Sequence, residues 1–253
     1  MCTLRKTPRY EAMPRTARLR IPGVPLHIVQ RGRSKQSCFF GTSEYELYLG
    51  LLQEFATPHG CAIHAYVLMT NHVHLLLTPA DPHGFSDMMS IVNQRYGQRV
   101  NRTYGWSGSL WQGRFWSCPI ESERYLFTCQ RYVEMNPVRA RLADYPAGYP
   151  WSSYAANAAG AASRLLTPHP LYLALGATTE ERHAAYCGLF STDLSVEEVA
   201  RIRGASRSGR PLGSDEFLVR MGFRVGRSKP GPVPKAGRPH QQCLEVGATG
   251  FIL

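Results

Sequence analysis

VLMTNHVHLLLTP, residues 67–79, places His72 and His74 two positions apart in a run that is otherwise mostly apolar. Alternate side chains of a β-strand lie on one face, so the two imidazoles would stand side by side, next to Leu76. Burying unpartnered imidazoles is costly, whereas a shared divalent metal would bind both rings. The pattern therefore predicts a strand with a metal site. The alternative is a structural pair hydrogen-bonded at a strand edge.

The residues around this strand predict an α+β fold. Thr70 and Asn71 form a plausible tight turn, so residues 61–79 predict a hairpin. Strands are also expected at 25–32 and 110–120, and helices at 42–55, 86–105 and 121–142. The order β-α-β-β-α-β-α is typical of the ferredoxin-like split βαβ fold, with one antiparallel sheet and helices on one face.

Helix-start signals accompany several of these segments. Ser43 and Glu46 have capping-box spacing near the start of the first expected helix, and Ser195 and Glu198 have it near a later one. A further short helix is expected from Ser214.

The chain divides by composition into three parts. Residues 22–140 contain the strand and helix pattern, and 141–163 are rich in small residues and turn formers, as in a linker. Residues 164–240 are expected to be a basic helical extension that binds DNA. Its candidate DNA-binding residues are Arg207, Arg210, Arg224 and Arg227.

The net charge of +11 is unevenly distributed along the chain. Residues 1–35 carry nine Lys/Arg and one acid, residues 201–238 carry ten and two, and residues 36–200 carry ten and fourteen. Basic segments at both sides of a mildly acidic body favour a polyanionic partner, with nucleic acid first. Basic tails that aid solubility or reach an anionic membrane surface are the alternative.

Composition also excludes several classes of protein. The seven cysteines are scattered and never form a Cys-x-x-Cys pair, which argues against a disulfide framework or a cysteine zinc site. No stretch approaches the roughly 20 apolar residues of a membrane span, and the N-terminal residues lack the apolar core of a secretory signal. We expect a cytoplasmic, nucleoid-associated protein with no membrane partner.

Tyr132 and Asn136 lie four positions apart in the expected helix 121–142, so their side chains would share one strip of its surface. A phenol near a metal-bound phosphate can act as a nucleophile. Asn136 could supply an oxygen ligand beside the imidazoles. Without further context, ordinary helix packing of Tyr132 and a helix stop at Pro137 explain the same residues.

Aromatic and basic residues elsewhere are candidates for DNA contact. Trp111, Trp116 and Arg114 could supply base stacking and phosphate charge, as single-strand binding commonly requires. Arg31, at the end of the first expected strand, is a similar candidate. The alternative is a packed tryptophan pair with a solvated arginine.

Three motifs together resemble a known family. MTNHVHLLL, SLWQGRFWS and RYVEMNPVRA, in this order and at these separations, resemble the single-tyrosine HUH transposases of the IS200-like superfamily, specifically the REP-associated branch. The resemblance covers about residues 22–140. It maps the family's metal-binding histidines onto His72 and His74 and its nucleophile onto Tyr132. Insertion-sequence relatives have a glutamine where this chain has Asn136, which puts the third metal ligand in question.

The resemblance implies metal-dependent cleavage and rejoining of single-stranded or hairpin DNA at repetitive extragenic palindromes. Mg²⁺ or Mn²⁺ would orient the scissile phosphate, and Tyr132 would form a 5′-phosphotyrosine intermediate and release a 3′-hydroxyl.

Two other functions compete with this one. A non-catalytic protein that binds or regulates hairpin DNA on the same fold would differ only in lacking nicking activity. A histidine-triad nucleotide hydrolase would need a third alternating histidine where Leu76 stands, and we set it aside.

Overall fold

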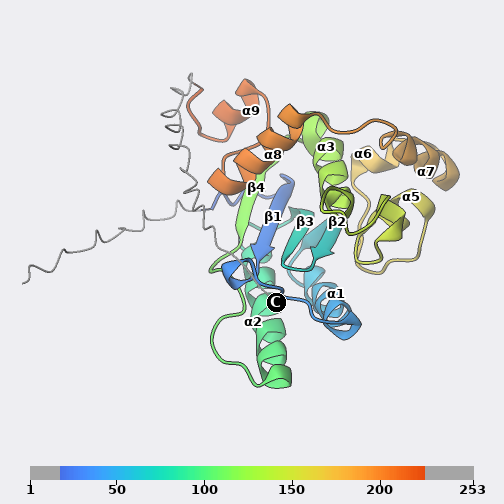
Figure 1. The fold of residues 1–253 in the computed structure, drawn as a ribbon. Coiled ribbons are helices and arrows are strands. Elements are labelled where there is room, and N and C mark those ends of the chain that lie inside the picture. Colours follow the sequence, from blue (N-terminus) through green and yellow to red (C-terminus); the bar gives the residue numbers. More distant parts are fainter. Residues whose placement is uncertain (1–17, 226–253) are drawn as a thin grey trace, which may run out of the picture.

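A four-stranded antiparallel sheet lies at the centre of the protein, in a computed structural model that describes residues 18–225 (Figure 1). The strands are β1 (Leu26–Arg31), β2 (Cys61–Met69), β3 (His72–Pro79) and β4 (Trp116–Pro119). They lie in the order β2-β3-β1-β4, and every neighbouring pair is antiparallel. Strand order and pairing confirm the predicted ferredoxin-like fold.

The hairpin prediction is also confirmed, because Met69 pairs with His72 across the two-residue turn. The fourth strand is shorter than the predicted 110–120. Gly113 adopts a left-handed conformation with φ of 65°, which interrupts the extended run. Only Trp116–Pro119 continues as a paired strand beside β1.

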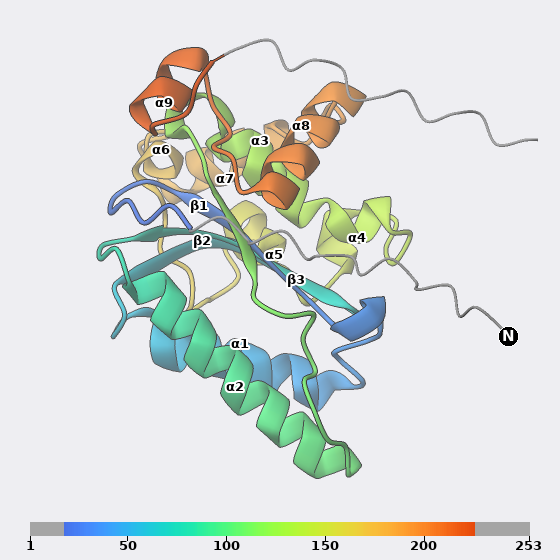
Figure 2. The same cartoon turned by 90° about the vertical axis from the view of Figure 1, so that its left-hand side faces the viewer.

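Helices α1 (Thr42–Ala56) and α2 (Gly84–Tyr104) cover one face of the sheet (Figure 2). Alternate residues of the central strands, such as Ile28 and Leu75, join the buried core on this face. The capping box predicted at Ser43 and Glu46 is not formed. The N-cap of α1 is Gly41, two residues before Ser43, and Ser43 lies inside the first turn.

The opposite face of the sheet is covered by α3 (Ser122–Glu134) and α8 (Val196–Ser208). The prediction placed the helices on one face of the sheet only. In the structure α3 and α8 cover the opposite face, so helices lie on both faces. Leu76 of β3 joins Val133 of α3 and Ile202 of α8 in a second apolar cluster. Since His72 and His74 alternate in phase with Leu76, both imidazoles share this second face.

The remaining helices follow α3 in the chain, and the 3₁₀ turn η1 (Arg33–Lys35) lies between β1 and α1. The helices are α4 (Asn136–Arg139), α5 (Tyr154–Ala159), α6 (Pro170–Leu173), α7 (Thr179–Gly188) and α9 (Asp215–Arg220), with a second short 3₁₀ turn, η2 (Pro146–Gly148). The predicted helix starts at Ser195 and Ser214 are confirmed, because each hydroxyl accepts a hydrogen bond from a backbone N–H of the first turn. Among residues 18–225, no helix has the length and hydrophobicity needed to cross a membrane.

The segment predicted as a linker, 141–163, packs along the free edge of β2. Ser152 forms an isolated antiparallel bridge with Val67, and the backbone N–H of Leu68 donates to the carbonyl of Trp151 at 2.9 Å. A free strand edge has unpaired backbone groups, and this segment satisfies some of them.

The described part of the predicted extension, residues 164–225, also packs onto the sheet instead of standing apart from it. Leu212 pairs with the backbone at Ile120, just beyond β4, and Ile202 is 1% exposed in the second apolar cluster. The physical reason is that α3 alone leaves apolar surface of the sheet uncovered. Ile202 and Leu212 of this segment are therefore part of the protein core. Residues 226–240 lie outside the described range.

A buried carboxylate joins α3 to the segments that follow it. Glu134 accepts hydrogen bonds from Ser153 Oγ at 2.5 Å, Asn157 Nδ2 at 2.8 Å and Tyr186 OH at 2.7 Å. The three donors come from the segment before α5, from α5 and from α7, so one side chain connects three parts of the chain to the end of α3.

Candidate active site

The two histidines of β3 line a cavity of about 360 Å³ on the second face of the sheet. Their ring centroids are 4.9 Å apart. Its other lining residues include Trp116, Tyr132, Asn136 and Ser206 together with Arg31, Arg139, Arg203 and Arg207. The cavity is thus formed by all four strands together with α3, α4 and α8.

His72 is held by the turn that precedes it. The side-chain amide of Asn71 donates to the carbonyl of Lys35 at 3.1 Å, which points its oxygen toward His72 Nδ1 at 2.6 Å. An amide oxygen only accepts, so His72 Nδ1 carries the hydrogen and Nε2 keeps its lone pair. His74 Nδ1 is likewise in a hydrogen bond, at 2.8 Å from His27 Nε2. Within the described chain, neither Nε2 of the pair has a hydrogen-bond partner.

Both imidazoles are neutral at physiological pH. Burial and the charge of Arg31 lower the pKa of His72 to about 4. Burial, and then the neighbouring His72, lower the pKa of His74 well below its ordinary value of 6.5. A neutral imidazole with a free ring nitrogen is the form that binds a metal.

Tyr132 lies on the last turn of α3, and its ring meets that of His74 edge-on at 5.8 Å between centroids. The side chain is 5% exposed. The Arg139 guanidinium lies over the Tyr132 ring, 4.4 Å from its centroid, and also donates to the Tyr132 carbonyl. Asn136 donates from Nδ2 to the same carbonyl at 3.1 Å.

The cavity is strongly cationic. Arg31, Arg139, Arg203 and Arg207 line it, and no carboxylate does so within the described chain. Burial lowers the pKa of Arg139 to about 10, which still leaves it charged at neutral pH. The Nε atoms of Arg31 and Arg139 are buried without a hydrogen-bond partner among the described residues. Buried donors of this kind require an acceptor, and an anion in the cavity would provide one.

The residues fit a divalent cation only in part. Two Nε2 atoms with free lone pairs face a common space, and the Asn136 amide oxygen has no hydrogen-bond partner in the described chain. Among residues 18–225, no group of three His, Cys, Asp or Glu side chains is placed to hold a metal ion. A cation here would therefore depend on two imidazoles, with oxygen ligands from Asn136 and a substrate phosphate.

Only some of the predicted DNA-binding residues line the cavity. Trp116, Arg31 and Arg207 line the cavity. Trp111 does not: it is 8% exposed within the core on the opposite face, and its indole N–H donates to the Asn93 carbonyl at 3.0 Å. The prediction that Trp111 contacts DNA is wrong, because this ring is packed beneath the sheet.

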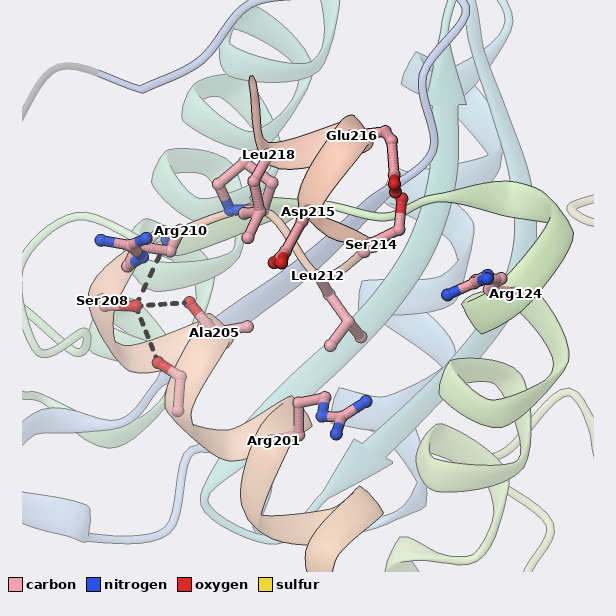
Figure 3. A pocket seen from close by; sticks show the side chains of 13 residues that line it. Arg124, Arg201, Ala205, Ser208, Arg210, Leu212, Ser214, Asp215, Glu216 and Leu218 are labelled. Atoms are coloured by element: carbon pink, nitrogen blue, oxygen red, sulfur yellow. Dashed lines mark hydrogen bonds between the residues drawn. The ribbon is translucent and has the colours of Figure 1, made fainter. Parts of the chain in front are cut away.

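The other four predicted arginines do not line this cavity in the described residues. Arg114 and Arg224 are exposed and outside the cavity, so their DNA contacts stay predictions, and Arg227 lies outside the described residues. Arg210 lines a separate cavity of about 630 Å³ between α3, α8 and α9 (Figure 3). Asp215 and Glu216 line that cavity as well, so its charge is mixed.

Sequence reasoning did not place four residues beside the histidine pair, namely His27, Arg139, Arg203 and Ser206. A lone strand histidine such as His27 carries no local signal of function. Arg139 had a usable signal, because it lies seven positions after Tyr132 and two helical turns would bring it onto the same side. Arg203 and Ser206 reach the site only through the packing of α8.

Comparisons with known proteins relate the chain to transposases. Residues 21–136 match the family model described as "Transposase IS200 like". The chain resembles a solved REP-associated tyrosine transposase bound to a REP hairpin, with 19% identity, a TM-score of 0.51, and coverage of 62% of this chain and 93% of that one. A candidate transposase from Deinococcus radiodurans R1 aligns with 20% identity, a TM-score of 0.34, and coverage of 48% and 96%. No curated protein matches the chain.

The fold is α+β, and its cavity brings a histidine pair beside a tyrosine. Residues 21–136 match the IS200-like transposase family model, and the REP-associated structure has a similar fold. This assignment supports DNA transposition as the function, carried out by an enzyme that acts on DNA.

Proposed function

We propose that the protein cleaves and rejoins single-stranded DNA at hairpin-forming repeats, with Tyr132 as nucleophile. One observation carries the proposal: Tyr132 and His74 meet in a cavity that four arginines line and that contains no carboxylate in the described chain. A phosphodiester is the substrate group that such a cavity suits, because it is anionic and accepts several hydrogen bonds.

In the cleavage step, the Tyr132 hydroxyl oxygen attacks phosphorus and the bond from phosphorus to the 3′ oxygen breaks. The phenol loses its proton and the departing 3′ oxygen gains one, so the product is a 5′-phosphotyrosine and a free 3′-hydroxyl. Rejoining is the reverse reaction with a second 3′-hydroxyl, and it needs no external energy source because one phosphodiester replaces another.

The residues of the cavity have separate roles in this step. Arg139 orients the Tyr132 ring, and the free Nε of Arg31 would donate to a phosphate oxygen. Arg203 and Arg207 extend the positive surface along α8. His72 and His74, with Asn136 as third ligand, would hold Mg²⁺ or Mn²⁺, which when bound polarises the phosphate.

Hairpin DNA is the proposed partner for two reasons. The structure of similar fold is described as bound to a REP hairpin. The basic segments 1–35 and 201–238 suit a double-stranded stem, where phosphate contacts dominate affinity.

The test uses end-labelled single-stranded hairpin DNA from the source genome, with Mn²⁺, followed by denaturing gels. Wild type should form a covalent adduct, and Tyr132→Phe should form none. Tyr125→Phe is the matched control, since Tyr125 lies on the same helix but outside the cavity, and it should retain the adduct.

An adduct that persists in Tyr132→Phe would disprove the assignment of the nucleophile. Hairpin binding by wild type with no adduct on any repeat would favour the non-catalytic DNA-binding protein instead.

A further inference from the structure

A buried chain of hydrogen bonds runs from α8 to the histidine pair. Ser206 Oγ lies 2.9 Å from His27 Nδ1, and His27 Nε2 lies 2.8 Å from His74 Nδ1. The planes of the two imidazoles differ by 11°. Ser206, His27 and His74 are 9%, 1% and 5% exposed, so water has little access to these bonds.

The direction of this chain follows from its first member. Ser206 Oγ also lies 2.8 Å from the carbonyl of Ile202, one helical turn earlier. A carbonyl only accepts and a hydroxyl has one hydrogen, so that hydrogen is directed to Ile202 and the oxygen accepts from His27. The thiol of Cys118, at 3.9 Å, is a weak donor to the same oxygen and does not change the direction.

The direction at Ser206 also determines which ring nitrogens of His27 and His74 carry hydrogen. His27 donates from Nδ1 to Ser206, and a neutral imidazole has only one N–H, so His27 Nε2 must accept. His74 therefore donates from Nδ1, and its Nε2 keeps the lone pair. The reverse order would place the hydrogen on His74 Nε2 and abolish its capacity to bind a metal.

We propose that Ser206 and His27 are positioning residues that hold His74 in the Nδ1–H tautomer, so that Nε2 is the ligand atom for a divalent cation. The role toward the cation rests on the function proposed above. Metal-binding histidines commonly donate their second ring nitrogen to such a partner, which orients the ring. His72 has an equivalent partner in Asn71.

The segment after residue 164 therefore helps to position a candidate metal ligand. Ser206 and His27 are 179 positions apart, and only the packing of α8 on β1 and β4 brings them together. Loss of α8 would therefore disturb the candidate metal site as well as any DNA contact made by its arginines.

The test compares Ser206→Ala with Ser208→Ala in the full chain. Ser208 lies on the same helix and bonds the Gly204 carbonyl at 2.8 Å in the same way, but it is exposed and contacts no histidine. Ser206→Thr keeps the hydroxyl and serves as the rescue variant. Thermal melting and a dispersed amide spectrum establish that each variant is folded.

Two readouts are used, and neither is catalytic. Long-range ¹H–¹⁵N NMR reports which nitrogen of His74 carries the hydrogen in the metal-free protein, and the electron paramagnetic resonance signal of free Mn²⁺ gives the Mn²⁺ affinity. We expect the Nδ1–H tautomer in wild type, Ser208→Ala and Ser206→Thr. Ser206→Ala should lose this preference and bind Mn²⁺ at least about tenfold more weakly.

A hydrogen on His74 Nε2 in wild type would overturn the proposal, and so would a Ser206→Ala variant that matches Ser208→Ala in both readouts. If wild type binds no Mn²⁺ yet shows the Nδ1–H tautomer and loses it in Ser206→Ala, the positioning role is supported and the metal part of the proposed function fails.

Discussion

Replacing Glu134 with Gln should change how the stability of the protein depends on pH. The side chain is fully buried, and the hydroxyls of Ser153 and Tyr186 and the amide of Asn157 donate to it. Burial raises the pKa of this carboxyl from its ordinary value of 4.5 to about 7, and the three donors offset part of the rise. The folded protein therefore binds a proton here more tightly than the unfolded chain does.

The sign and size of the effect follow from this difference. The stabilising contribution is complete below pH 4.5 and is lost as the pH rises through about 7, because the folded state must then bury a charged carboxylate. Each tenfold difference in proton affinity corresponds to about 1.4 kcal/mol. Between pH 5 and pH 8, wild type should lose roughly 2 to 3 kcal/mol that the Gln variant does not lose.

The tyrosines near Glu134 do not change this predicted loss of stability, because they do not ionise in this pH range. Tyr66, Tyr154, Tyr172 and Tyr186 lie near it, and burial raises the pKa of each above its ordinary value of 10. All four are therefore uncharged below pH 8.

The assay is urea unfolding followed by tryptophan fluorescence at pH 5, 6.5 and 8. Glu46→Gln, which removes an exposed glutamate from α1, controls for the loss of one negative charge. The free energy of unfolding of wild type relative to Glu134→Gln should fall as the pH rises. A constant difference across the three pH values would refute the reasoning.

Three further predictions concern packing, charge and metal. Ile202→Ala should lower the free energy of unfolding by about 2 to 5 kcal/mol in urea, because Ile202 is 1% exposed, whereas Val196→Ala, 81% exposed on the same helix, should change it little. Arg203→Ala and Arg207→Ala should each reduce the slope of log affinity for single-stranded DNA against log salt by about 0.7, and an unchanged slope would remove them from the binding surface. EDTA should stop formation of the Tyr132 adduct while hairpin binding measured by gel shift continues; adduct formation at the normal rate in EDTA would exclude a metal requirement.

The local sequence determined most elements of residues 22–140 and the identity of the central pair, but it did not predict α5, α6 or α7. Alternation in residues 72–79 places His72 and His74 on one face with Leu76, and the structure has that arrangement. Capping at Ser195 and Ser214 marks helix starts correctly because it involves residues within one turn. The same rule failed at Ser43, because the N-cap of α1 is Gly41, two residues earlier.

Only the tertiary structure decided which side chains surround the pair. Trp111 and Trp116 look alike in the sequence, yet the first lies in the core beneath the sheet and the second lines the cavity. His27 and Ser206 meet across 179 positions because α8 covers apolar surface that α3 leaves exposed on the sheet. Sheet register and helix packing set such contacts through long-range burial, and a pattern read over a few neighbouring residues does not contain that information.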